Sequence, residues 1–261
     1  MKKKTLSVII ILVAAFIGRS SMFAQSSTYL NLGVNLPQGN FGSKADNCVL
    51  YSNNDQGGAN TGINVGFKFI NRTKANGLGF MFTVDGMYNK LQSDLSSENF
   101  VDYNTDQYGH IIEEIEGIPI TVKNPKYFNL PVMAGLNYSS DFNRTLGFFV
   151  EAGAGINARF ITPCKITAFD YTLDLKPDYT FTNRYTTKFA FAFQFGVGIK
   201  IKDAITLGVS YFDLGSALVQ GTTEKLLKTT ASAPVVGEKE NFKYRQLSTK
   251  MLVVRLGIHL G

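Results

Sequence analysis

The stretch TKFAFAFQFGVGIKIK, which begins at Thr187, alternates large apolar residues with small or polar ones. Phenylalanine recurs at every second position, at Phe189, Phe191, Phe193 and Phe195. Because successive side chains of a strand point to opposite faces, one face of this segment carries only large apolar groups. Such a face is covered either by a protein core or by the hydrocarbon of a membrane.

The same period-two alternation recurs along the chain, whereas long windows with helical spacing are hard to find. Glycine (25) and phenylalanine (21) are plentiful, and tryptophan is absent. A mean hydropathy of zero excludes a protein with several membrane-spanning helices. The sequence therefore predicts an all-β chain. The predicted strands are residues 29–36, 62–70, 78–89, 127–138, 146–160, 187–202, 204–212 and 250–260.

The connections between these predicted strands alternate strictly between long and short. Four of them span about 25 to 38 residues, and the other three are short turns such as Lys202-Asp203. This segregation is typical of an outer-membrane barrel, with short periplasmic turns at one end and long extracellular loops at the other. We expect an eight-stranded antiparallel up-and-down transmembrane β-barrel, with a soluble two-sheet core as the alternative.

The N-terminus has the features of an export signal. Three lysines precede a short apolar run, and Met22-Phe23-Ala24 supplies a small-residue cleavage site. We expect residues 1–24 to be a signal peptide and residues 25–261 to form the barrel domain, in the outer membrane of a Gram-negative bacterium. Removal of the signal takes away four cations and no acid, which lowers the formal net charge from +6 to +2. The basic isoelectric point therefore does not indicate a nucleic-acid partner.

Two cysteines occur, Cys48 and Cys164. In an exported protein they could form a disulfide, and they allow a single intramolecular pairing. The spacing does not decide whether they are bonded.

Four polar residues on the inward-facing side of different predicted strands come at similar heights in the barrel: Asp85, Glu151, Gln194 and Arg255. An eight-stranded barrel has an interior just wide enough to be filled by side chains. Buried carboxylates next to a guanidinium are tolerated when they are paired. We expect these four residues to form a polar plug in the lumen. Independently hydrated charges are the alternative.

The sequence offers little for catalysis. Its two histidines, His110 and His259, fall at opposite ends of the predicted topology, and neither has a nucleophile or ligand at a suitable spacing. The acidic run IIEEIEG favours a solvated loop over a calcium site. We expect no enzyme activity, no cofactor and no bound metal.

Several segments resemble a known family. The first strand YLNLGVNLPQGNF, the central KYFNLPVMAGLNY and the glycine-punctuated FFVEAGAGIN and FQFGVGIKI resemble the PorT-like outer-membrane β-barrels, within the porin-like and OmpA/OmpX-like eight-strand barrels. The resemblance implies an integral outer-membrane protein. Some members of this family assist secretion to the cell surface. One departure is the C-terminus Leu260-Gly261, where barrels of this type usually end in an aromatic residue.

The predicted function is therefore a non-enzymatic role in surface interaction, envelope structure or secretion. Outer-membrane lipid is the expected surrounding, and envelope or secretion proteins are the expected partners through the long loops. Aromatic loop residues are candidate contacts, unless they pack onto the rim of the barrel: Phe100, Tyr103, Tyr108, Phe242 and Tyr244. A small-solute diffusion channel and a lipid-modifying enzyme are the competing functions.

Overall fold

A computed structural model describes residues 25–43, 57–72, 76–91, 120–169, 178–202, 204–228 and 236–260. The predicted signal peptide lies outside these residues. Among them, no helix combines the length and the apolar character needed to cross a membrane. The described chain forms strands and one short 3-10 helix, with these bounds: β1 (Gln25–Gln38), η2 (Gly39–Phe41), β2 (Ala59–Arg72), β3 (Gly77–Leu91), β4 (Ile120–Lys123), β5 (Lys126–Asp141), β6 (Leu146–Ile161), β7 (Cys164–Phe169), β8 (Asp178–Tyr185), β9 (Lys188–Ile201), β10 (Ile205–Lys228) and β11 (Val236–His259).

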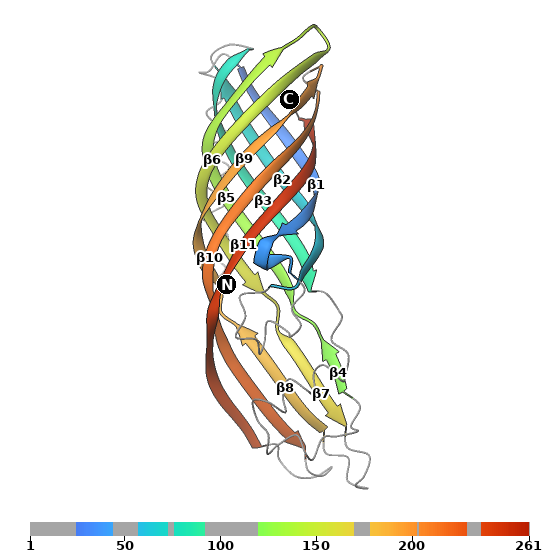
Figure 1. Ribbon diagram of the computed structural model, residues 1–261, viewed down its shortest axis with the longest axis vertical. Helices are drawn as coiled ribbons and strands as arrows, with labels where there is room; N and C mark the ends of the chain where they lie inside the picture. The colour runs from blue at the N-terminus through green and yellow to red at the C-terminus, as the bar shows by residue number, and fades with distance from the viewer. Residues whose placement is uncertain are drawn as a thin grey trace.

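Eight of these strands close into a ring. They run in the order β1-β2-β3-β5-β6-β9-β10-β11, each antiparallel to its neighbours, and β11 pairs with both β10 and β1 (Figure 1). The eight predicted strands correspond one to one with these strands, although most are longer than predicted. The predicted eight-stranded antiparallel barrel is confirmed, and a two-sheet sandwich is wrong because the ring has no open edge.

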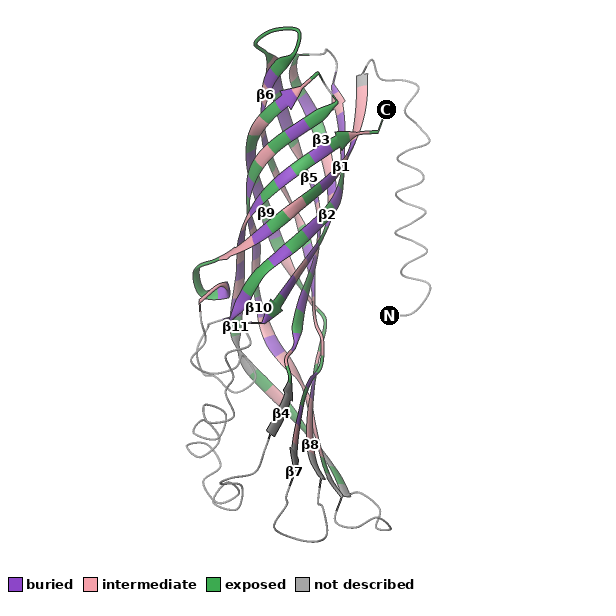
Figure 2. Cartoon of the chain, turned by 90° about the vertical axis from the view of Figure 1, so that its right-hand side faces the viewer, coloured by how far each residue is buried: buried purple, intermediate pink, exposed green. Residues whose placement is uncertain are grey.

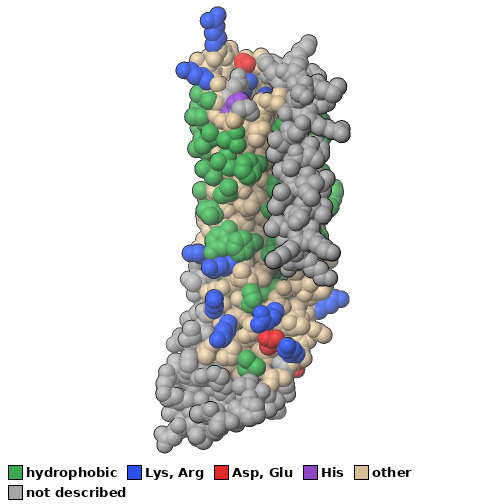
Figure 3. Space-filling model, turned by 180° about the vertical axis from the view of Figure 1, so that it is seen from behind, with side chains coloured by type: hydrophobic (Ala, Val, Ile, Leu, Met, Phe, Trp, Pro, Cys, Tyr) green, Lys and Arg blue, Asp and Glu red, His purple; other side chains and the backbone are tan. Residues whose placement is uncertain are grey.

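Burial alternates along most of the length of the ring strands, as Figure 2 shows. On β9, Phe189 is 71% exposed, whereas Ala192 is fully buried. The phenylalanines of the opening stretch therefore lie on the outside of the ring, and its small residues face the lumen. Exposed apolar side chains occur on the other ring strands too and form an apolar belt on the outside of the barrel. Figure 3 shows part of this belt on one face.

The two ends of the barrel differ in how the strands continue. At the short-turn end, at the top of Figure 1, β5 turns into β6 and β9 into β10. At the opposite end, here called the extension end, β4, β7 and β8 continue the sheet beyond the ring (Figure 1). They pair in the order β10-β8-β7-β4, next to the long hairpin formed by the distal halves of β10 and β11.

This extension corrects the sequence prediction, which assigned residues 161–186 and 213–249 to loops. β7 and β8 occupy much of the first segment, and the distal halves of β10 and β11 occupy most of the second. These segments lie beyond the apolar belt, so their outer face does not have to be apolar. Their sequences therefore lack a one-sided apolar pattern. Their pairing relies instead on threonines and cross-strand charges such as Glu224 opposite Lys239.

The transition from barrel to extension occurs on β10. Up to Asp213 this strand pairs with β9, and from Gly221 onward it pairs with β8. The register with β11 shifts between Asp213 and Ser216 and again near Val219. Gly215 lies between Asp213 and Ser216, within the first of these shifts. Its φ is 74°, a conformation that side-chain-bearing residues rarely adopt. A bulged glycine therefore lets one strand serve both parts of the molecule.

Candidate functional site in the barrel lumen

Four charged side chains meet in the lumen near the middle of the barrel: Lys68 on β2, Asp85 on β3, Glu151 on β6 and Arg255 on β11. None of them is more than 5% exposed. We call these four residues the charged layer. Two cations face two carboxylates, so the layer as a whole is neutral.

Glu151 is the centre of the charged layer. Its Oε2 accepts a hydrogen bond from Lys68 Nζ at 2.9 Å and a longer one from Asn137 Nδ2 at 3.4 Å. Its Oε1 accepts from Arg255 Nη2 at 2.6 Å. Both carboxylate oxygens are therefore bonded to a cation, which is the condition under which a buried carboxylate is tolerated.

Arg255 links the two acids. Besides Glu151, its Nη2 donates to Ser210 Oγ at 2.6 Å, and its Nη1 lies 3.6 Å from Asp85 Oδ1. Asp85 Oδ1 also accepts from Asn64 Nδ2 at 3.1 Å. The guanidinium is centred 5.2 Å from the Phe212 ring. This packing and these bonds hold the group in one position.

The strand register explains why these long side chains fit. Asp85 lies opposite Gly66, Glu151 opposite Gly196, and Arg255 opposite Gly33. A Cβ added at Gly66 would collide with the Asp85 carboxylate, and one added at Gly196 would collide with Ser210 and Glu151. Three of the four charged side chains, those of Asp85, Glu151 and Arg255, thus lie over a glycine of a neighbouring strand, so the bare backbone provides the room.

The predicted plug and the observed layer overlap without being identical. The structure brings Asp85, Glu151 and Arg255 together. Gln194 is also buried, but it pairs with Gly153, two residues along β6 from Glu151, and its Nε2 donates to Met81 Sδ at 3.7 Å rather than to a charge.

Lys68 belongs to the charged layer, and sequence reasoning missed it. A signal was present, because Lys68 shares the inward-facing side of its strand with Asn64 and Gly66. A single sequence does not give the register between strands β2 and β6, which are not neighbours in the ring. That Lys68 reaches Glu151 across the lumen therefore follows only from the closed barrel.

Apolar clusters fill the lumen on both sides of the charged layer. Toward the short-turn end lie Tyr29, Ile70 and Met81. Toward the extension end lies a larger cluster that includes Phe41 and Tyr127, whose rings are 5.1 Å apart. The Tyr127 hydroxyl donates to the Gly57 carbonyl at 2.7 Å and ties the chain after η2 to the barrel wall. The lumen is thus occupied by packed side chains at three successive levels.

The predicted contact and disulfide residues fall mostly outside the described chain, which does not include Cys48, Phe100, Tyr103 and Tyr108. Phe242 belongs to β11 rather than to a loop, and it packs against the apolar cluster and the Tyr185 ring at 5.6 Å. Tyr244 also belongs to β11. Cys164 is buried on β7, and burial raises the pKa of its thiol to about 12. Its pairing with Cys48 stays a prediction.

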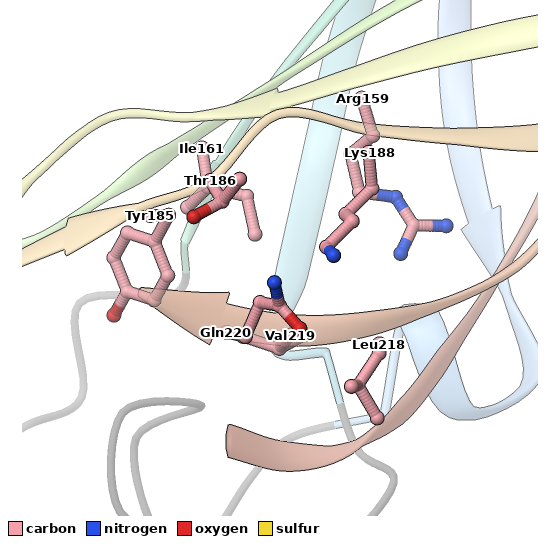
Figure 4. A pocket seen from close by; sticks show the side chains of 8 residues that line it. All are labelled: Arg159, Ile161, Tyr185, Thr186, Lys188, Leu218, Val219 and Gln220. Carbon is pink, nitrogen blue, oxygen red and sulfur yellow. The ribbon is translucent and has the colours of Figure 1, made fainter. Parts of the chain in front are cut away.

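A small pocket opens where β10 changes partners. Figure 4 shows Arg159 and Lys188 next to each other, opposite Leu218 and Gln220 of β10. Its volume is about 10 Å³, room for about one water molecule. Arg159 donates to the carbonyl oxygens of Leu247 at 2.9 Å and Gly215 at 3.1 Å, so it bridges the gap that the partner change leaves. These bonds give Arg159 a structural role.

The described residues contain no group of three or more His, Cys, Asp or Glu side chains placed to hold a metal ion. His259 packs against the Tyr29 ring at 5.1 Å near the short-turn end, and His110 lies outside the described residues. What the lumen offers chemically is paired charge inside apolar packing, an arrangement suited to closing the barrel.

Comparison with known proteins supplies the family. A profile of the outer membrane protein beta-barrel domain matches residues 23–213. A search of curated proteins gives no match. The narrower PorT-like resemblance finds no support in these comparisons.

The solved structures similar to this chain include the following three. Ail, the attachment invasion locus protein of Yersinia pestis, in complex with the heparin analogue sucrose octasulfate, shares 10% identity at a TM-score of 0.39, over 91% of this chain and 100% of that chain. A major outer membrane protein from Thermus thermophilus shares 8% identity at a TM-score of 0.40, over 91% of this chain and 100% of that chain. Neisserial surface protein A shares 10% identity at a TM-score of 0.38, over 90% of this chain and 98% of that chain. The fold rests on the closed ring of strands rather than on these likenesses. Because the profile covers most of its length, this chain belongs to the outer membrane protein beta-barrel domain family.

Proposed function

We propose that this chain is a non-enzymatic outer-membrane protein whose barrel is closed by its own side chains. In this proposal the signal peptide directs export, the short-turn end faces the periplasm, and the extension end lies outside the cell. The single observation that carries it is the charged layer of Lys68, Asp85, Glu151 and Arg255, packed between apolar clusters. Ions crossing the lumen would have to break this layer and pass both clusters.

The extension gives such a barrel a means of contact. Its strands β4, β7 and β8 and the distal β10–β11 hairpin form a sheet beyond the ring of eight strands (Figure 1). Paired strands thus occupy much of the chain that the sequence predicts as separate loops, and they offer one joined contact surface. It could serve surface interaction, envelope structure or assistance to secretion. Phe242, which packs inward, contributes to the stability of the sheet rather than to contact.

Conductance across a planar lipid bilayer tests the closed lumen. The purified folded barrel is expected to give no discrete current steps, while a general diffusion porin reconstituted in parallel gives the positive control. Reproducible steps from the wild-type protein would reject the closed lumen in favour of the small-solute channel.

The non-enzymatic assignment needs its own test. Envelope lipids from cells with the wild-type protein and from cells with the His110→Ala variant are compared by mass spectrometry. We expect identical lipid species. A lipid that appears only with the wild-type protein would favour the lipid-modifying enzyme.

A further inference from the structure

Four lysines form two like-charged pairs on the outer face of the barrel rim at the extension end. Lys90 of β3 lies directly opposite Lys126 of β5, and Lys123 of β4 lies directly opposite Lys165 of β7. All four are exposed. We call this set the lysine patch. Its two pairs follow one another along the wall, since β4 precedes β5 and β7 follows β6 in the chain.

Like charges directly opposite each other on antiparallel strands destabilise the pairing. Across the described chain, no carboxylate forms an ion pair with any lysine of the patch, whereas Arg184, Lys225 and Lys239 of the extension are paired. Lys239, for example, lies 3.1 Å from Glu224. The repulsion within two such pairs in succession would be relieved by negative charge from outside the described strands.

The position of the lysine patch indicates where that charge comes from. Tyr88 and Phe128 lie two residues from Lys90 and Lys126 on the same outer face, with their rings 5.0 Å apart. Lys126 Nζ is 5.9 Å from the Tyr88 ring. Membrane barrels carry girdles of aromatic residues at the interface between hydrocarbon and headgroups, and this pair fits such a girdle. The patch therefore begins where the apolar belt ends.

Figure 3 shows the same order on one face of the molecule, where Lys and Arg side chains gather directly beyond the apolar belt. A lysine ammonium at this depth can stay hydrated while its methylene stem lies along the apolar wall. Lysine is a common ligand of phosphate, which it binds as a point charge. Phosphate is also the negatively charged group found at headgroup level.

We propose that the lysine patch binds the phosphorylated headgroup of a lipid in the leaflet at the extension end. Each cross-strand pair places two ammonium groups on one phosphate-bearing headgroup, which relieves their mutual repulsion. The proposal rests on the proposed function only for the orientation that makes this leaflet the outer one. A conducting barrel would reject the closed lumen and leave the lysine patch untouched.

The test measures lipid binding by native mass spectrometry of the full folded chain in detergent. The probe is lipid A that carries two phosphates, and its dephosphorylated form is the comparison. The wild type is expected to bind the phosphorylated form and not the other. Loss of two lysines near an anionic headgroup should weaken binding roughly thirtyfold, so we expect this loss for both K90Q/K126Q and K123Q/K165Q.

A matched control removes two lysines from the far part of the extension. The K225Q/K239Q variant changes the net charge by the same amount, and its lysines already have carboxylate partners. It should bind lipid A as the wild type does. An equal loss in this control would overturn the patch in favour of bulk charge, and full binding by both patch variants would overturn it directly.

Two other sources of negative charge have their own outcomes. Inorganic phosphate that displaces lipid A at equal concentration would show that a free anion, rather than a lipid, is the ligand. Residues 92–119 contain seven acids and no lysine or arginine. If this segment neutralises the lysines, the wild type will bind no phosphorylated lipid, and the proposal fails.

Discussion

Arg255 has two carboxylate neighbours inside the barrel, and its removal would leave their charge uncompensated. The Arg255→Ala variant keeps Lys68 as the single cation for Asp85 and Glu151. Breaking a buried ion pair by deleting one partner costs about 3–5 kcal/mol. We expect a loss of this size in the free energy of unfolding. A lower temperature of conversion from the compact to the slow-migrating form on gels should reveal it.

A surface cation on the same strand is the control for this variant. Lys250 is half-buried, and its Nζ lies 3.9 Å from Asp213 Oδ2. Pairs of this kind contribute about 0–1 kcal/mol, so Lys250→Ala should convert at nearly the wild-type temperature. Equal midpoints for the wild type and Arg255→Ala would mean that the charges of the layer are hydrated independently.

The thiol of Cys164 gives a second prediction for a single residue. Because burial raises its pKa to about 12, this thiol stays protonated at pH 8 and is shielded from reagents. Iodoacetamide should modify it slowly in the folded protein and rapidly after denaturation without reductant, as measured by mass spectrometry. A protein that resists modification until reductant is added would instead have the Cys48–Cys164 disulfide.

At the scale of elements, the sequence predicted the strands that contact the apolar belt better than those that do not. The eight ring strands carry a one-sided apolar pattern because hydrocarbon and lumen impose opposite demands on successive residues. The extension strands lack this pattern, so residues such as Thr222 and Glu224 look like loop residues in the sequence. The predicted lumenal cluster was incomplete for a different reason. Lys68 and Glu151 meet across the lumen, and periodicity along one strand does not report such contacts.

Glu224 links three strands of the extension and gives the sheet a pH dependence. Hydrogen bonds from Lys239 on β11, and then from Arg184 on β8, lower its pKa below the ordinary value of 4.5. A carboxyl with a lowered folded-state pKa stabilises the fold fully above the unfolded-state pKa, and this contribution is lost as the pH falls through the folded-state value. The β8–β10 pairing should therefore weaken on acidification below about pH 4.5.

Hydrogen exchange of the β8 and β10 backbone amides measures this change. In the wild type, protection of these amides should decrease on acidification, after correction for intrinsic exchange rates, while the ring strands keep theirs. Glu224→Gln removes the titrating group, so its protection should be lower than wild type near neutral pH and should vary less with pH. Identical profiles for the two proteins would exclude Glu224 as the cause.

At the scale of the whole molecule, the barrel reverses the arrangement of a soluble protein. Its polar side chains, such as Glu151 and Asn157, are buried in the lumen, while large apolar ones such as Phe193 and Ile63 are more than half exposed on the outside. A soluble protein rarely exposes a contiguous apolar patch of more than a few hundred Å². A complete belt of this kind is stable only when hydrocarbon covers it. The cost of a charge on the belt should then depend on its depth in the membrane.

Strand β9 offers a ladder of positions to measure this dependence. Phe195 lies near the middle of the strand and Phe189 near its extension end, and both side chains point outward. An arginine at the bilayer midplane of a barrel costs about 2–4 kcal/mol, and one near the interface costs about 0–1 kcal/mol. Denaturant unfolding of the barrel in lipid vesicles should therefore show a large loss for Phe195→Arg and a small one for Phe189→Arg. The alanine variants at both positions separate the lost ring from the added charge. If protein packing covered the phenylalanines instead, the cost would follow local contacts, and Phe189→Arg could cost as much as Phe195→Arg.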